Sequence, residues 1–85
     1  MQINERAELL KALQKGQVQV TFRKVNTGEI RVMPCTLNPA ILEANDVTIK
    51  INYSADKMDV FPVWSLDKNA WRSFILDTVE AWEVL

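Results

Sequence analysis

Residues 17–23 alternate strictly between polar and apolar types, which is the pattern of a strand that buries one face. The apolar face carries Val18, Val20 and Phe22. Asn-Thr-Gly at 26–28 then predicts a turn, and the alternation resumes in residues 29–37. Pro34 predicts a bulge or a strand end there, because proline cannot donate to a ladder. The pattern therefore predicts a hairpin from residue 17 to about residue 33.

Ahead of this hairpin, residues 3–13 repeat apolar side chains at helical spacing and place charged ones on the other side. Asn4 is the predicted N-cap, and Gly16 predicts a left-handed stop at the C-terminal end. We therefore expect a short amphipathic helix within residues 1–16.

Further along, Asn38 and Pro39 predict the cap and the first position of a single helical turn. Three more strands are predicted by alternation and by the turn residues between them: residues 46–53, 60–66 and 71–79. The tail, residues 80–85, is expected either to extend the last strand or to pair at a sheet edge.

One helix and five short strands in so short a chain predict a mainly β fold, a small and strongly bent barrel over residues 17–85. A flat sheet would leave its edges exposed. With 85 residues there is room for one hydrophobic core, so residues 1–85 are expected to form a single domain.

Composition narrows the chemistry. The chain has no histidine, which is the commonest general base and transition-metal ligand, and it has one cysteine and two glycines. We therefore expect no enzyme, no cofactor and no metal site. Cys35 is expected to be a small core residue, and a lone cysteine favours a reducing cytoplasm. Charged residues interrupt the N-terminal segment and no apolar run reaches membrane length, so we expect neither export nor a membrane span.

Basic and aromatic residues supply the candidate binding groups. Trp64 and Trp71 flank the last predicted turn, where they either accept bases by stacking or pack a hairpin. Arg72 contacts a phosphate or base in the first case and an indole ring in the second. Lys68, in the turn, either adds a positive charge or is simply solvated.

A second basic group brackets the first predicted turn: Arg23, Lys24 and Arg31. The alternation predicts that Arg23 and Arg31 point outward on paired strands. Such a patch either binds phosphates weakly or protects strand edges from pairing with other chains. The net charge of −1 means that any nucleic-acid site must be local.

The run Trp-Arg-Ser-Phe-Ile-Leu-Asp at 71–77 resembles the closing hairpin of WYL-type domains, and residues 20–37 resemble their opening hairpin. The likeness extends over roughly residues 17–79. It is closest to a small phage-encoded branch that consists of little more than this one domain. The resemblance implies an SH3-like, Sm-like barrel.

In larger proteins of this type the barrel is thought to sense a ligand, often nucleic acid, through a basic pocket. Arg72 matches the first basic position of the closing strand, and Ile75 and Thr78 stand where further arginines are common. The resemblance thus implies a phage protein that binds RNA or single-stranded nucleic acid in the bacterial cytoplasm.

Two other functions remain open. The apolar tail, with Trp82, Val84 and Leu85, favours a module that inhibits or redirects a host protein. Alternatively, the barrel forms a homo-oligomer by edge pairing, and the function belongs to the assembly.

Overall fold

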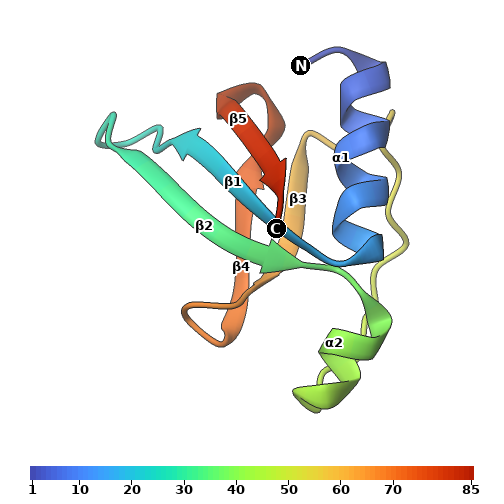
Figure 1. Cartoon of the computed structure of the whole chain (residues 1–85). Helices are drawn as coiled ribbons and strands as arrows, with labels where there is room; N and C mark the ends of the chain where they lie inside the picture. Colours follow the sequence, from blue (N-terminus) through green and yellow to red (C-terminus); the bar gives the residue numbers. More distant parts are fainter.

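The computed structural model describes all 85 residues as two α-helices, one 3₁₀ turn and five strands (Figure 1). In chain order these elements are α1 (Ile3–Lys15), β1 (Gln17–Arg23), β2 (Ile30–Thr36), α2 (Pro39–Ala44), β3 (Val60–Ser65), β4 (Ala70–Ile75), η1 (Leu76–Thr78) and β5 (Val79–Val84). Neither α-helix has the length and apolar character that crossing a membrane would require.

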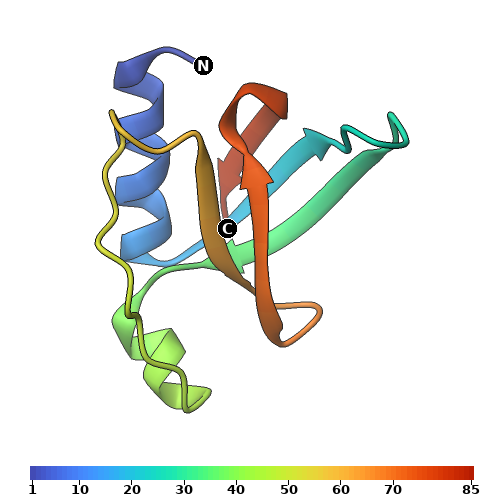
Figure 2. The ribbon, with the colours of Figure 1, turned by 180° about the vertical axis from the view of Figure 1, so that it is seen from behind.

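The five strands form one antiparallel sheet in the order β4-β3-β2-β1-β5. This sheet curls, so that the β3–β4 hairpin crosses the β1–β2 hairpin when the molecule is seen from behind (Figure 2). Alternate residues of β1 and β3 turn their apolar side chains to the concave side, where they form the core together with Met33 and Cys35 of β2 and Phe74 of β4. The predicted fold class, a small barrel of five strands after an N-terminal helix, is confirmed.

Helix α1 covers one end of the curled sheet (Figure 1). Leu9 and Leu13 on its inner face are fully buried in the core, as the helical spacing predicts. The end of β2 is fastened to the same helix, because the Leu37 amide donates to the Leu13 carbonyl at 2.9 Å. The buried Thr36 hydroxyl donates to the Gly16 carbonyl at 2.6 Å. These two hydrogen bonds hold the C-terminal end of α1 against the end of β2.

The predicted N-cap was wrong, and Gly16 ends the helix as predicted but without a left-handed conformation. Gln2 precedes the first turn, so Asn4 lies inside the helix, and the Arg6 amide donates to the Gln2 carbonyl at 3.0 Å. Gly16 has a φ of 178°, which is extended backbone open to any residue. The helix ends here because the chain passes directly into β1 at Gln17, and no left-handed residue is needed.

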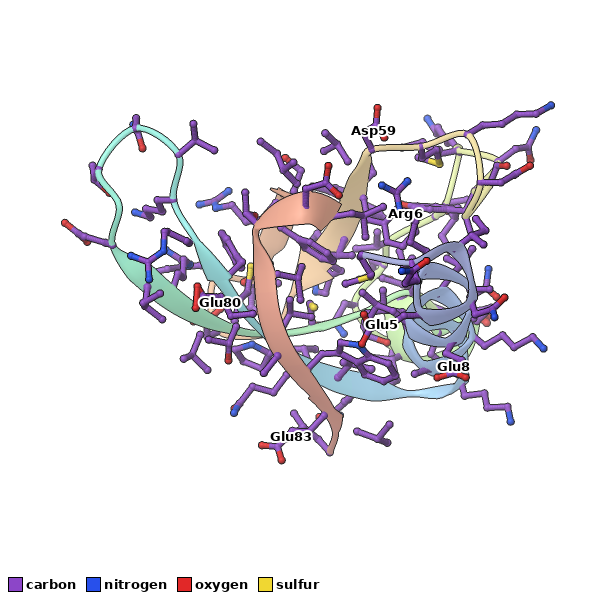
Figure 3. All side chains as sticks on the ribbon, turned by 90° about the horizontal axis from the view of Figure 1, so that it is seen from above. Glu5, Arg6, Glu8, Asp59, Glu80 and Glu83 are labelled. Carbon is purple, nitrogen blue, oxygen red and sulfur yellow. The ribbon has the colours of Figure 1, made fainter.

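Arg6 joins three segments that are distant in the sequence. Its guanidinium donates to the Met58 carbonyl at 3.1 Å and to the Asp77 carboxylate at 3.3 Å, and it lies 3.5 Å from Asp59. Figure 3 shows Arg6 pointing from α1 toward the start of β3, where Asp59 lies. Only 14% of the Arg6 side chain is exposed, so this cation is held in one position.

The strand predicted over residues 46–53 is absent. After α2 the chain runs back along α1 to the start of β3 without pairing to any strand (Figure 2). Its alternation is real, but Ile51 is exposed. The Tyr53 hydroxyl instead donates to the Pro62 carbonyl, which lies in β3. A strand requires a ladder partner, and alternation alone does not supply one.

The strand predicted over residues 71–79 is two strands with a corner between them. β4 ends at Ile75, the Thr78 hydroxyl donates to the Ile75 carbonyl at 2.6 Å, and β5 then pairs with β1. Leu76 is fully buried at this corner. Here the chain leaves β4, which pairs with β3 at one edge of the sheet, and enters β5, which pairs with β1 at the other edge. Residues 80–85 were expected either to extend the last strand or to pair at a sheet edge, and the structure confirms the pairing at an edge.

Asn38 caps α2 as predicted, because its side chain accepts from the Ile41 amide at 3.1 Å and Pro39 takes the first turn. Pro34 was predicted to mark a bulge or a strand end, but β2 continues through it to Thr36. The Leu66 amide donates to the Pro34 carbonyl at 2.9 Å, so the backbone polar groups of Pro34 face β3.

The missing amide of Pro34 therefore lies on the β3 side, and β2 pairs with β3 only at Cys35 and Thr36. Residues 30–33 of β2 have no strand on that side. Pro34 therefore marks the point where the pairing of β2 with β3 ends, while the pairing of β2 with β1 continues.

The contact between α1 and the barrel gives the first prediction. Leu13→Ala should lower the free energy of unfolding by about 2–5 kcal/mol, because it leaves a cavity beneath the helix. Urea denaturation followed by tryptophan fluorescence measures this change. The matched substitution Lys11→Ala, on the exposed side of α1, should change stability by less than about 0.5 kcal/mol. Equal effects of the two substitutions would contradict the packing of α1 described above.

Candidate functional site

A pocket of about 510 Å³ opens between the distal half of the β1–β2 hairpin and β4. Its lining residues are Phe22, Arg23, Lys24, Val25, Asn26, Arg31, Met33, Arg72, Ser73, Phe74, Ile75 and Thr78. The floor is apolar: Phe22 of β1 and Phe74 of β4 stack at 5.9 Å between ring centroids, with 30° between the planes. Met33 is buried beside them in the same core cluster. The pocket is thus the open end of the barrel core.

Four cations and no carboxylate contribute to the lining: Arg23, Lys24, Arg31 and Arg72. The strand register accounts for two of them. Arg31 lies opposite Phe22, and Arg72 lies opposite Val63, so both share the concave face with core residues. The structure therefore brings together four of the seven candidate residues.

Arg31 was predicted to point outward, and this was wrong. Both faces of β2 carry apolar side chains, and the buried face is the one with Met33 and Cys35. Ile30 and Val32, which would face the core if Arg31 pointed outward, are each 49% exposed. The inner face therefore continues to Arg31 at the end of the strand, where the core meets solvent.

Three of the four cations are free of ion pairs. Arg31 and Lys24 have no carboxylate within salt-bridge distance, and Arg72 donates only to the Trp71 carbonyl at 3.0 Å. Arg23 differs, because its Nε lies 3.4 Å from Glu80 and its Nη1 donates to the Gly28 carbonyl at 2.7 Å. The pocket presents three uncompensated positive charges and a fourth that is paired.

The two tryptophans lie on the other face of the β3–β4 hairpin. Trp64 and Trp71 are cross-strand partners whose rings meet edge to face at 5.8 Å and 83°. Successive residues of a strand alternate between faces, so Trp71 is separated from Arg72 by the sheet. Trp71 is 37% exposed, beside a shallow hollow that it shares with Ile51 and Pro62. The indoles and Arg72 do not form one surface, and a binding role for the indoles stays a prediction.

Lys68 lies in the β3–β4 turn, outside the pocket. Its neighbour Asp67 accepts from the Ser65 hydroxyl at 2.5 Å. That hydrogen bond is the main cause of a lowered pKa at Asp67, and the charges of Arg31 and Lys68 add to it. A carboxylate therefore stands beyond Arg31, and part of the Lys68 charge is compensated there.

The titratable groups of the interior give no reactive nucleophile. Burial, reinforced by the charge of Asp67, raises the pKa of Cys35 to about 12, so the thiol is neutral at physiological pH. Burial likewise raises the pKa of Tyr53 to about 12. No group of three or more potential metal-ligating side chains gathers anywhere in the structure. The pocket has the means to bind an anion and an apolar ring.

The sequence did not identify the floor as part of the site. Phe22 was predicted only as part of the apolar face of a strand, and Met33 and Phe74 were given no role in a site, although Phe22 is the cross-strand neighbour of a candidate cation, Arg31. If the register of the first hairpin had been assigned, Arg31 would have been placed opposite Phe22. A basic residue opposite an aromatic core residue is the signal that would have indicated the pocket.

The second prediction concerns Cys35. Because the thiol is buried and its pKa is raised, an aromatic disulfide reagent at pH 8 should modify it only after denaturation. Absorbance of the released thiolate measures the reaction. Rapid labelling of the native protein would contradict the burial of Cys35, and the variant Cys35→Ala gives the background signal.

A family model described as WYL_2, Sm-like SH3 beta-barrel fold, matches residues 6–79. The match includes β1 to β4, η1 and all of the pocket's lining residues. Ile75 and Thr78, which stand at positions where arginines are common in the resembling domains, line the same pocket as Arg72. No curated protein and no solved structure matches the chain.

Proposed function

We propose that this chain, which belongs to the WYL_2 family of Sm-like SH3 β-barrels, binds single-stranded RNA or DNA in the pocket between the β1–β2 hairpin and β4. The barrel itself is a binding-type fold. The observation that carries the proposal is the combination of three unpaired cations, Lys24, Arg31 and Arg72, with an apolar lining. The exposed part of that lining is Val25 and Ile75, around the buried Phe22–Phe74 pair.

Single strands suit this arrangement better than duplexes. Phosphates bind the guanidinium and ammonium groups, while an unstacked base has an apolar face that can cover the exposed side chains of Val25 and Ile75. In a duplex the bases are stacked on one another and are not free to reach a recessed floor. The side chains thus favour a ligand that offers both a phosphate and an exposed ring.

Binding of this kind is local. The net charge of −1 provides no long-range attraction for a polyanion, so contacts inside the pocket must supply the affinity. Each phosphate contact releases counterions and makes the affinity fall with salt. A bacteriophage protein acting in the cytoplasm of the infected cell is the setting that the sequence resemblance suggests for such a module.

A protein partner is the second candidate function, and one observation favours it. β5 pairs only with β1, so its other edge is unpaired, and Val84 and Leu85 at its end are 65% and 58% exposed. An extended segment of a host protein, or the β4 edge of a second copy, would add to this edge by strand pairing. Capture from bacterial lysate with and without nuclease separates this candidate from nucleic-acid binding.

The third prediction tests the pocket directly. A fluorescein-labelled single-stranded RNA should gain polarisation when the protein is added at about 50 mM salt. Arg72→Ala and Arg31→Ala should each weaken binding by about tenfold, equivalent to about 1.4 kcal/mol. Lys68→Ala, which removes a cation outside the pocket, is the matched control and should change affinity by less than about twofold. The absence of any polarisation change would sink the proposal.

The fourth prediction concerns the tryptophans. Trp71→Ala removes an exposed indole from the face opposite Arg72, so RNA affinity should stay within about twofold of the unsubstituted protein. Stacking on that indole would instead be worth about 1–3 kcal/mol per base. A loss of tenfold or more in the same polarisation assay would return the tryptophans to the binding site.

A further inference from the structure

We infer that the pocket holds only a short stretch of phosphates, such as the end of a strand or a short oligonucleotide, and that carboxylates at both ends prevent a longer strand from gaining further contacts. This inference rests on the proposed function and specifies the ligand of the same site. It follows from where the acidic side chains lie around the pocket.

At the first end, the pocket continues past Arg23 into a second hollow that also contains Lys24, Val25 and Thr78. The residues that this hollow adds include two acids, Asp77 and Glu80. Glu80 lies 3.4 Å from the Arg23 Nε and takes up part of its charge. Asp77 is already bound by Arg6. A backbone that follows the cations in this direction therefore meets Glu80 first.

At the second end, the Cys35–Ser65 pair and the hydrogen bond from the Leu66 amide to the Pro34 carbonyl bring the start of the β3–β4 turn alongside β2, so Asp67 lies beside the strand that carries Arg31. The Ser65 hydroxyl orients its carboxylate at 2.5 Å, and Asp67 is close enough to feel the charge of Arg31. Lys68 follows in the same turn, but its charge sits beside this carboxylate. A strand that leaves the pocket past Arg31 therefore meets a negative charge as well.

The run of unpaired cations is thus Lys24, Arg31 and Arg72, with acids on both sides. Screening at physiological salt limits exposed charges to a range of about 8 Å, so a phosphate outside the pocket is influenced mainly by the nearest side chains. The carboxylates of Glu80 and Asp67 are among those side chains. Additional nucleotides beyond the pocket bring repulsion in place of further attraction, and the affinity should stop rising once the pocket is filled.

Two measurements follow from this charge arrangement. Three phosphate contacts on a single strand give a salt slope of about −2, which corresponds to a loss of about 20-fold in affinity between about 50 mM and 200 mM salt. A 5′-phosphorylated uridine trinucleotide and a uridine strand of about 20 nucleotides should then compete for a labelled probe with dissociation constants within about threefold of each other. The competition is followed by fluorescence polarisation.

Three outcomes are distinguishable. Equal competition by the short and long strands, with the shallow salt slope, supports the inference. An affinity that rises steadily with length, with a slope steeper than about −4, overturns the inference and leaves nucleic-acid binding intact. Failure of every oligonucleotide to bind overturns both the inference and the proposed function.

Glu80→Gln tests the acidic limit directly, with Glu83→Gln as the matched control. Both glutamates are exposed on β5, and Figure 3 shows Glu80 beside the β1–β2 hairpin and Glu83 at the far end of β5. Glu83 accepts from Gln19 at 3.3 Å and lies outside both hollows.

Glu80→Gln frees Arg23 and removes the charge that repels a continuing strand. We expect the preference for the long strand over the trinucleotide to rise by about fivefold and the salt slope to steepen by about 0.7. Glu83→Gln should leave both quantities unchanged. If Glu80→Gln leaves the length preference as it was, or if the two variants behave alike, Glu80 does not limit the site and the inference is wrong.

Discussion

Only two residue pairs, Cys35 with Ser65 and Thr36 with Trp64, join β2 to β3. The curled shape of the sheet depends on this short ladder. Pro34 offers no amide on the β3 side, so the strands separate immediately beyond the pair, and β3 with β4 swings across the β1–β2 hairpin. The Phe22 and Phe74 rings then meet across the barrel, and the distal halves of the two hairpins enclose the pocket. A longer ladder would flatten the sheet and separate the two rings.

The same crossing explains why a protein of nearly balanced charge has a cationic site. The inner faces of β2 and β4 change from apolar to basic where they leave the core, at Arg31 and Arg72. Each guanidinium is therefore supported by buried aromatic neighbours on one side and open to solvent on the other. None of the eleven acidic residues lines the pocket. Position in the barrel, rather than total charge, determines what the pocket attracts.

Local pattern was enough to predict the N-terminal helix, the first hairpin, the Asn38 cap and the fold class. It failed where the outcome depended on what lies beside a segment. Residues 46–53 alternate as a strand does but have no partner strand. The corner at Leu76–Thr78 could not be predicted from the alternation of polar and apolar residues. Both faces of β2 carry apolar side chains, so the alternation does not say which face is buried. Packing in the folded structure places Met33, and with it Arg31, on the inner face. The basic residues of the pocket were identified from the sequence, whereas their grouping and the aromatic floor required the fold.

The position of β1 in the sheet also has a kinetic meaning. β1 forms a local hairpin with β2, but its other neighbour is β5, so Val18 pairs with Val84 near the opposite end of the sequence. Closing so long a loop costs chain entropy before any β1–β5 contact repays it, and folds dominated by such pairings fold slowly for their size. The sheet is complete only when β5 has paired with β1, and until then the outer edge of β1 is a site where another extended chain can pair.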